Sequence, residues 1–303
     1  MENLLMRLFC FLLICFWSQS LLANDHGWVD ITIDNGHIKF PVVIQGNQGL
    51  AILDSGAQLN AINDSFVNKH KLKVKVGRKV TVMGIFGKEL RETYNDLKVE
   101  MFSAPLKFDG VVSAPLGHPD NAILLGANFM NNFIIQTDYV NQKIRFLDRE
   151  SINLKKVKNL EMMAQKGSGQ PIIKIRLNNE DDLWLLLDTG NNGGVMIERS
   201  VAIANNWLNT YPVVITNNRG VNSLGYSETF NVPTLEIGPF ILENVIVSVP
   251  AEGQSSNLAS QYEQSSSRLK GKRVRGILGY DVLKHFVLTI DYEKGYGHIA
   301  LPN

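Results

Sequence analysis

The chain has 303 residues, 45% of them hydrophobic, which is enough to fill two domains of ordinary size. Its formal net charge is +1, so the composition gives no electrostatic reason to expect nucleic acid or an anionic membrane as the main partner. Apolar and β-branched residues cluster in short runs that Gly, Asn, Asp and Pro interrupt, and this pattern predicts an all-β protein with a few short helices.

Residues 1–23 have the pattern of a secretory signal peptide, with one Arg, an uninterrupted apolar stretch from Leu8 to Trp17, and then small residues. The stretch is shorter than the roughly 20 residues of a membrane-spanning helix, so we expect cleavage, export and no stable membrane insertion. An uncleaved N-terminal anchor is the alternative. Cys10 and Cys15, the two cysteines of the chain, both lie in this leader. An exported protein without disulfides indicates a bacterial envelope, with a periplasmic or secreted location.

The first half of the mature chain is expected at residues 24–150. Two strands run through "PVVIQGNQGLAILDSG", which ends in the Asp-Ser-Gly motif of residues 54–56, and the helical segment "INDSFVNKH" follows. The segment "VTVMGIFGKEL" reads as a hairpin with Gly84 and Gly87 near its turn. A strand then ends in the Leu-Leu-Gly of residues 124–126, and the short helix "ANFMNNF" and a closing strand complete the half.

The second half, residues 151–303, repeats this order. "PIIKIRLNNEDDLWLLLDTG" corresponds to the first motif strand and "IERSVAIANN" to the first helix. "LLGANFMNNFIIQTDYVNQKIRFL" and "ILGYDVLKHFVLTIDYEKGYGHIAL" share a Gly, a Phe and an Asp-Tyr pair at one offset of 153 residues. The offset at the Asp motifs is 134 residues, so the second copy holds an insertion. Residues 251–276, poor in apolar residues and rich in Ser and Gln, predict a flexible surface insertion.

Each half ends a buried strand with a carboxylate. The runs "AIL" and "LLL" are apolar throughout, as in strands that are buried on both faces, and they leave Asp54 and Asp188 at the strand tips. Gly56 and Gly190 are expected to permit a tight turn that a Cβ would hinder. An ionised carboxylate taken out of water without partners costs several kcal/mol. If the two halves face each other across a pseudo-twofold axis, the two carboxylates meet.

These residues carry a family resemblance. The chain resembles a bacterial aspartic protease of the pepsin and retropepsin kind, with two homologous lobes in one polypeptide. Asp54-Ser55-Gly56 matches the family's first Asp motif and Asp188-Thr189-Gly190 matches its second, each followed by its own apolar-apolar-Gly strand. The resemblance implies a bilobal, internally duplicated acid-protease fold, aspartic-type endopeptidase activity on a peptide or protein substrate, no cofactor, and a monomer with pseudo-twofold symmetry.

The resemblance also implies a role for each motif residue. Asp54 and Asp188 would be catalytic and share a proton, so that one accepts a proton from water while the other donates one to the substrate carbonyl. The pair titrates as a unit, so neither Asp receives a separate role. The hydroxyl groups of Ser55 and Thr189 would bond across to the opposite loop and fix the geometry of the pair.

Gly84, Ile85, Phe86 and Gly87 fall where the family has a flap that covers the substrate, and flap glycines suit a lid that opens and closes. The segment "NNRGVNSLGYSE" is its counterpart in the second half. The sequence leaves open whether this segment is a second flap or only a surface hairpin.

The two Asp motifs continue differently. The first continues with Ala57, whereas the second continues with residues 191–194, Asn-Asn-Gly-Gly, and needs one extra residue. One alternative interpretation is that Asp188 only caps the following turn. Another is a catalytically inactive bilobal protein of the bacterial envelope that binds peptides. The histidines lack the spacing of a metal site, so no metal is expected; they are His26, His37, His70, His118, His285 and His298.

Overall fold

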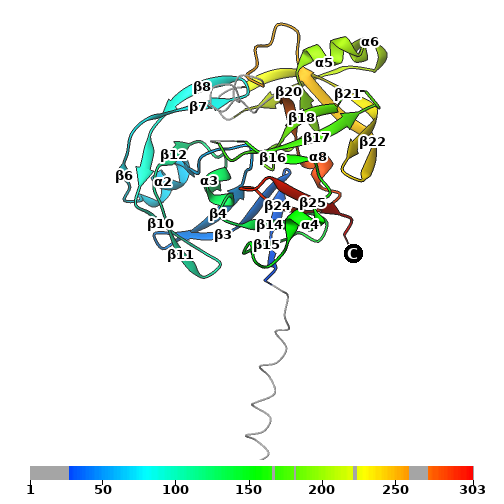
Figure 1. Cartoon of the computed structure of the whole chain (residues 1–303). Coiled ribbons are helices and arrows are strands. Elements are labelled where there is room, and N and C mark those ends of the chain that lie inside the picture. The colour runs from blue at the N-terminus through cyan, green and yellow to red at the C-terminus, as the bar shows by residue number, and fades with distance from the viewer. Residues whose placement is uncertain (1–26, 166–167, 181, 221–223, 259–271, 303) are drawn as a thin grey trace, which may run out of the picture.

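The computed structural model of the chain describes residues 27–165, 168–180, 182–220, 224–258 and 272–302. Strands predominate, the helices are short, and Figure 1 shows two β-rich lobes joined near the middle of the molecule. The predicted leader lies outside the described residues. Within the part of the chain that is described, no helix is both long enough and apolar enough to cross a membrane.

The first lobe is built on a sheet with the strand order β11-β10-β3-β4-β13-β5-β12-β9-β6, and β2 pairs with β3. Its strands are β2 (Thr32–Asp34), β3 (His37–Ile44), β4 (Asn47–Leu53), β5 (Ala61–Asn63), β6 (Lys75–Val76), β9 (Thr93–Asn95), β10 (Leu97–Met101), β11 (Ala104–Phe108), β12 (Val111–Ala114) and β13 (Asn121–Leu125). At its centre β4 runs parallel to β13, which is antiparallel to β5. Ala51, Ile52 and Leu53 of β4 are all buried, as the apolar run predicts.

The second lobe has the strand order β16-β17-β18-β23-β19-β22-β21-β20, and β17 also pairs with β21. Its strands are β16 (Met162–Ala164), β17 (Pro171–Leu177), β18 (Asp182–Leu187), β19 (Val195–Ile197), β20 (Val214–Arg219), β21 (Leu224–Ile237), β22 (Phe240–Pro250) and β23 (Val274–Leu278). Here β18 runs parallel to β23, which is antiparallel to β19. The strands around the second Asp motif therefore repeat the arrangement of β4, β13 and β5.

A third sheet joins the two halves, in the order β1-β15-β14-β24-β25. Its strands are β1 (Val29–Asp30), β14 (Ile134–Asp138), β15 (Lys143–Leu147), β24 (Val287–Asp291) and β25 (Tyr296–Ala300). Strands β14 and β24 are antiparallel, and Gln136 lies opposite Thr289. Gln136 Nε2 donates to Thr289 Oγ1 at 2.8 Å, across the same 153 residues that separate equivalent positions of the repeat. Two equivalent residues that face each other mark the pseudo-twofold axis.

The remaining elements are one hairpin and a set of short helices. The hairpin is a separate two-stranded sheet of β7 (Val80–Gly84) and β8 (Gly87–Arg91). The helices are α2 (Asp64–His70), α3 (Ala127–Met130), α4 (Leu154–Val157), α5 (Arg199–Ala204), α6 (Trp207–Thr210) and α8 (Tyr280–Leu283). Helices α2 and α5 follow the two Asp motifs, and α3 and α8 follow the two apolar-apolar-Gly strands, as the repeat predicts.

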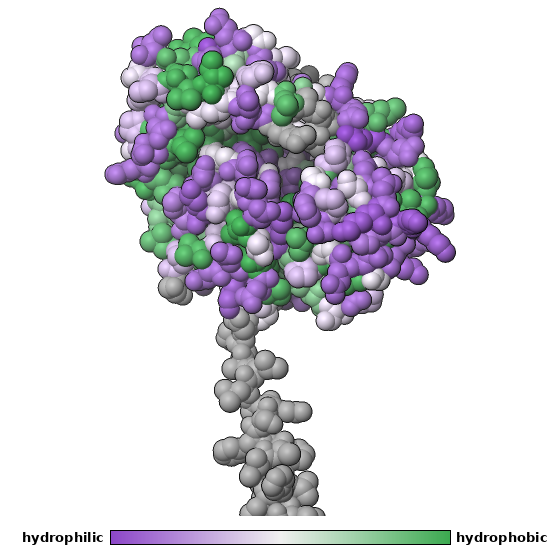
Figure 2. Space-filling view, turned by 180° about the vertical axis from the view of Figure 1, so that it is seen from behind, coloured by the Kyte–Doolittle hydropathy of each residue, from purple (hydrophilic) through white to green (hydrophobic). Residues whose placement is uncertain are grey.

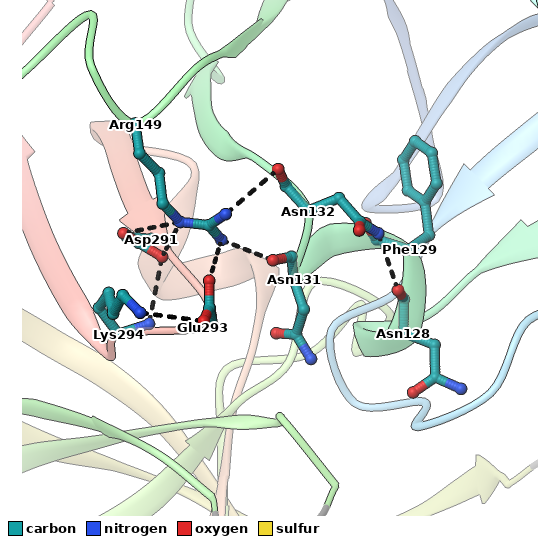
Figure 3. Close-up of polar contacts among 8 residues, drawn as sticks. All are labelled: Asn128, Phe129, Asn131, Asn132, Arg149, Asp291, Glu293 and Lys294. Carbon is teal, nitrogen blue, oxygen red and sulfur yellow. Dashed lines mark hydrogen bonds and ion pairs between the residues drawn. The ribbon is translucent and has the colours of Figure 1, made fainter.

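A polar cluster around Arg149 ties the two halves together beside the central sheet (Figure 3). The guanidinium group of Arg149 donates to the backbone oxygen of Asn131, after α3, at 2.5 Å. It also lies 3.3 Å from the carboxylate of Asp291 and 3.1 Å from that of Glu293. Asp291 is buried, so this ion pair is screened by water less than a surface pair. The cluster holds the end of α3 against the β24–β25 turn.

The face opposite to the view of Figure 1 is largely hydrophilic, and hydrophobic residues gather at one upper corner of it (Figure 2). This corner corresponds to the region of α5, α6 and β20 in Figure 1. The exposed large hydrophobic side chains of these elements include Ile203, Val214 and Ile215. Because β20 is the last strand of its sheet, these side chains mark the outer edge of the second lobe.

Candidate active site

Asp54 and Asp188 occupy equivalent places at the ends of β4 and β18. The N–H of Asp54 donates to the oxygen of Leu125 in β13 at 3.0 Å, and the N–H of Asp188 donates to the oxygen of Leu278 in β23 at 2.9 Å. Each Asp therefore continues the pairing of its parallel strands by one residue. Both residues are half-buried, so each keeps some contact with solvent.

Ser55 and Thr189 each bind the loop of the opposite half. Ser55 Oγ donates to the oxygen of Leu187 at 2.7 Å, and Thr189 Oγ1 donates to the oxygen of Leu53 at 3.0 Å. Each hydroxyl oxygen also accepts a bond from the backbone N–H of the other residue, in both cases at 3.0 Å. Both side chains are buried, and these bonds satisfy hydroxyl groups that water does not reach. The two Asp loops are thus fixed to each other.

Gly56 and Gly190 pack against the carboxyl group of the opposite Asp. A Cβ added to Gly56 would collide with the side chain of Asp188, and a Cβ added to Gly190 would collide with that of Asp54. Neither glycine has a positive φ. Both glycines lie in turns and a Cβ would be hindered, as expected, but the hindrance comes from the opposite lobe and not from the backbone conformation. They are needed because two loops approach each other too closely for any side chain.

Each carboxylate also binds its own loop. Asp54 Oδ1 accepts bonds from the N–H groups of Gly56 and Ala57 at 2.9 and 3.0 Å, and Asp188 Oδ1 accepts one from Gly190 at 2.8 Å. The turn-capping role considered for Asp188 is therefore present, and Asp54 has it as well. A carboxylate has two oxygens, so capping through Oδ1 leaves Oδ2 for a proton or a water.

Both carboxyl groups of the pair have raised pKa values, for different reasons. Burial raises the pKa of Asp54, while a side-chain hydrogen bond with Asp188 works in the opposite direction. Burial and, next, the negative charge of Asp54 raise the pKa of Asp188 well above its usual value. Both carboxyl groups are therefore harder to ionise than an isolated Asp, and Asp188 more so than Asp54.

The fold has a counterpart among solved structures. The crystal structure of aspartic proteinase from Irpex lacteus matches with a TM-score of 0.53 and 14% sequence identity, over 91% of this chain and 97% of that one. The fold is that of the pepsin-like aspartic proteinases. The predicted all-β, bilobal and internally duplicated acid-protease fold is thereby confirmed. No protein-family model matches the sequence, and no curated protein sequence matches it.

In this pepsin-like fold, the extra residue of the second Asp loop is Asn192. The first N–H of α3 donates to the oxygen of Ala57, and the first N–H of α8 donates to the oxygen of Asn191, both at 2.8 Å. The next N–H of α3, from Asn128, donates to the backbone oxygen of Gln58 at 3.1 Å. The next N–H of α8, from Asp281, donates to the backbone oxygen of Gly193 at 3.0 Å. The added residue thus lies between Asn191 and Gly193. The backbone pairing of Asp188 with β23 is the same as that of Asp54 with β13.

Gly84, Ile85, Phe86 and Gly87 form the tip of the hairpin β7–β8, which is called the flap below. The flap arches from the first lobe toward the second (Figure 1). A Cβ added to Gly225 of β21 would lie 2.6 Å from the ring of Phe86, so the ring rests directly on the second lobe. Ile85 and Phe86 also pack on an apolar cluster of that lobe. The flap therefore spans the two lobes.

Asn257 holds the flap tip, and sequence reasoning missed it. Its N–H donates to the oxygen of Ile85 at 2.6 Å, and its Nδ2 donates to the oxygen of Gly84 at 2.9 Å. Leu258 is 1% exposed and packs in the apolar cluster beneath the tip. The prediction of a flexible surface insertion at 251–276 is wrong for these two residues, because a polar stretch can still place one apolar residue in a core. It is also wrong for residues 274–276, which begin the buried strand β23. The middle of that segment lies outside the described residues.

Two further residues beside the Asp pair were also missed. Gln170, just before β17, is buried, and its Nε2 donates to the backbone oxygen of Gly56 in the opposite loop. His37 begins β3 and interacts electrostatically with Asp54. No short motif marks either residue. The signal that could have found them is strand register, because His37 begins, and Gln170 directly precedes, a strand that pairs with an Asp-bearing strand.

Proposed function

We propose that the protein is an aspartic-type endopeptidase in which Asp54 and Asp188 form the catalytic pair. The observation that carries this proposal is the reciprocal bonding of the two Asp loops through Ser55 and Thr189. A close pair of carboxyl groups is unfavourable because both are partly desolvated and like-charged when ionised. Perturbed carboxyl groups at such a junction favour a catalytic role over a structural one.

The chemistry follows from the single proton that the pair shares. The ionised carboxylate removes a proton from water as the water oxygen attacks the carbonyl carbon of the peptide bond. The protonated carboxyl group donates its proton to the carbonyl oxygen, which gives a neutral tetrahedral intermediate. When the C–N bond breaks, the carboxyl group that took the water's proton gives it to the leaving nitrogen. The other carboxylate takes a proton from a hydroxyl of the intermediate, so the pair again carries one proton.

The flap indicates the form of the substrate. An extended peptide that lies between the flap and the Asp pair would bond to the edge of the two-stranded flap, as a strand adds to a sheet edge. Gly84, Ile85, Phe86 and Gly87 would contact this peptide. We therefore propose an unfolded segment of a peptide or protein as substrate, with no metal or cofactor in the reaction.

The location of the protein is part of the same proposal. We propose that residues 1–23 are a signal peptide and that the lobes comprise residues 24–150 and 151–303, in a bacterial protein that is periplasmic or secreted. The alternative location is a membrane anchor formed by an uncleaved leader. We expect a monomer, because the pseudo-twofold axis at Gln136 and Thr289 already joins two equivalent halves within one chain.

Peptide hydrolysis by purified residues 24–303 tests the function. The parent is expected to cleave an unstructured peptide internally, and Asp54→Asn and Asp188→Asn are each expected to abolish cleavage while the circular dichroism spectrum stays the same. The matched control is Asp96→Asn, a change at an exposed Asp far from the pair, which should leave turnover unchanged. Parent-level turnover in either variant of the pair would refute the assignment. Peptide binding without hydrolysis by the parent would favour the catalytically inactive binding protein instead.

A further inference from the structure

Strand register places a different side chain beside each Asp of the pair. In the first lobe Ile38 of β3 pairs with Leu53 of β4, so the next facing positions are His37 and Asp54. In the second lobe Ile172 pairs with Leu186, and the same register continued by two residues brings Gln170 opposite Asp188. Facing residues of an antiparallel pair have their Cβ atoms about 5 Å apart. His37 and Gln170 are therefore equivalent neighbours of the two carboxyl groups.

The two neighbours differ in how their polar atoms are used. The amide of Gln170 donates to the backbone oxygen of Gly56 and carries no charge. The Nδ1 atom of His37 is buried and has no hydrogen-bond partner among the described residues. A buried polar atom without a partner costs free energy, and its retention calls for an explanation. An electrostatic role of the titratable His37 ring beside the carboxyl group of Asp54 would explain why a His is kept at this position.

Of the charged groups near His37 in the described part of the chain, Asp54 is the one that is not already paired with another charge. Asp34 of β2 lies opposite His37, and Lys39 lies two residues along β3. Lys39 Nζ and Asp34 Oδ2 form an ion pair at 2.6 Å, so these two charges offset each other. From the second lobe, the ring of Tyr280 approaches the neighbouring Gly36. Burial lowers the pKa of His37, and the charge of Asp54 opposes that shift.

We propose that His37 is a positioning residue that holds the negative charge of the pair on Asp54 and leaves the shared proton on Asp188. This proposal rests on the proposed function. When the pair loses its first proton, a protonated His37 stabilises the charge on the near carboxylate, whereas Gln170 offers no charge to the far one. The proton taken up by His37 comes from solvent, and no bond other than N–H forms or breaks.

The arrangement can be tested without any catalysis by an NMR titration of the histidine rings, with the His37 signal identified by its loss in His37→Gln. In Asp54→Asn, the pKa of His37 is expected to fall by about one unit, because the neighbouring negative charge is removed. In the matched variant Asp188→Asn it should not fall, since Asp54 then carries the charge. The signal of exposed His285 serves as an internal control. Equal pKa values of His37 in the parent and Asp54→Asn would overturn the proposal.

The second arm is the pH–rate profile. His37→Gln makes the two neighbours alike, and the acid limb of kcat/KM is expected to move upward by about one pH unit, a tenfold loss of rate at a pH below the limb. His285→Gln should leave the limb unchanged. An unmoved limb in a folded His37→Gln would refute the positioning role. If the parent hydrolyses no peptide, the proposed function fails, whereas the titration still decides the contact between His37 and Asp54.

Discussion

The two Asp loops share one backbone network but differ in the side chains around it. The hydroxyl bonds of Ser55 and Thr189 are symmetric to within a few tenths of an ångström. Outside this network, a compact loop in the first half corresponds to a loop with the added Asn192 in the second, and a His in the first half corresponds to a Gln. The side chains that bond across the pseudo-twofold axis, Ser55 and Thr189, make equivalent bonds in both halves. The side chains that do not cross the axis differ between the halves.

The two hairpins differ more than the two loops. The flap is a separate two-stranded sheet, whereas β20–β21 belongs to the eight-stranded sheet of the second lobe, where β21 also pairs with β22. The described residues of the second-half segment are paired within that sheet, and Gly225 supports the tip of the flap. One hairpin can move without breaking a sheet, and the other cannot.

Gly56→Ala and Gly190→Ala are expected to produce the largest effects and to be equally damaging. Each added Cβ would meet the opposite carboxyl group, so we expect about 3 kcal/mol of lost stability and loss of hydrolysis in both variants. Urea unfolding and peptide turnover measure the two effects. Gly193→Ala is the matched control, because a Cβ there would come no closer than 3.4 Å to its nearest neighbour. A tolerated Ala at one of the first two positions would break the equivalence of the halves.

Ser55→Ala and Thr189→Val should come next, at about 2 kcal/mol each. Each change removes a hydroxyl that makes two buried bonds and leaves one backbone oxygen and one N–H of the opposite loop unsatisfied. Denaturant midpoints of the two variants measure the costs. Similar costs would support a symmetric junction. A cost at Ser55 with none at Thr189 would show that one loop holds the other.

Asp188→Asn is expected to change how stability depends on pH. The pKa of Asp188 is raised in the folded protein, so the folded state binds the proton more tightly than the unfolded state does. The parent therefore loses stability as pH rises from about 4, the pKa of an unfolded Asp, through the raised folded value. The Asn variant lacks this loss and should become the more stable protein as pH approaches neutrality.

Urea unfolding of the parent and Asp188→Asn at a series of pH values measures this difference. Asp96→Asn is a control of opposite sign, because a hydrogen bond and the charge of Lys107 lower the pKa of Asp96. Its parent side chain contributes stability above the unfolded pKa and loses it on acidification. A stability difference for Asp188→Asn that does not grow with pH would contradict a raised pKa in the folded state.

Periodicity and repetition predicted much of the fold because they are properties of local sequence. The buried runs before the two Asp motifs and the offset of 153 residues sufficed for the duplicated strands, whereas the direct pairing of Gln136 with Thr289 was not predicted. Long-range contacts were not predictable in this way. Asn257 reaches the flap across 173 residues of chain, and no periodic pattern marks a single amide in a polar stretch. The reason for Gly56 was also missed, since the close approach depends on the opposite lobe.

Ala57→Thr tests the difference between the two loops by adding a donor to the first. Ala57 offers Asp54 only its backbone N–H, at 3.0 Å. A Thr hydroxyl at this place would donate to the carboxylate and favour its charged form, so the acid limb of hydrolysis should move downward by about one pH unit. The parent is accordingly expected to work best at mildly acidic to neutral pH. A strongly acidic optimum in the parent, or an unmoved limb in the variant, would show that this donor does not control the pair.

Asn257→Ala should have the smallest effect and the most local one. The change removes the bond from Nδ2 to Gly84 and keeps the backbone bond to Ile85, so the flap tip should lose about 1 kcal/mol of local stability. Amide hydrogen exchange in β7 and β8 is then expected to quicken about fivefold. Exchange in β20 and β21 should not change, because β22 and β17 hold that hairpin. Asn231→Ala, at an exposed amide of β21, is the matched control. Equal acceleration in both hairpins would mean that Asn257 stabilises the whole second lobe rather than the flap.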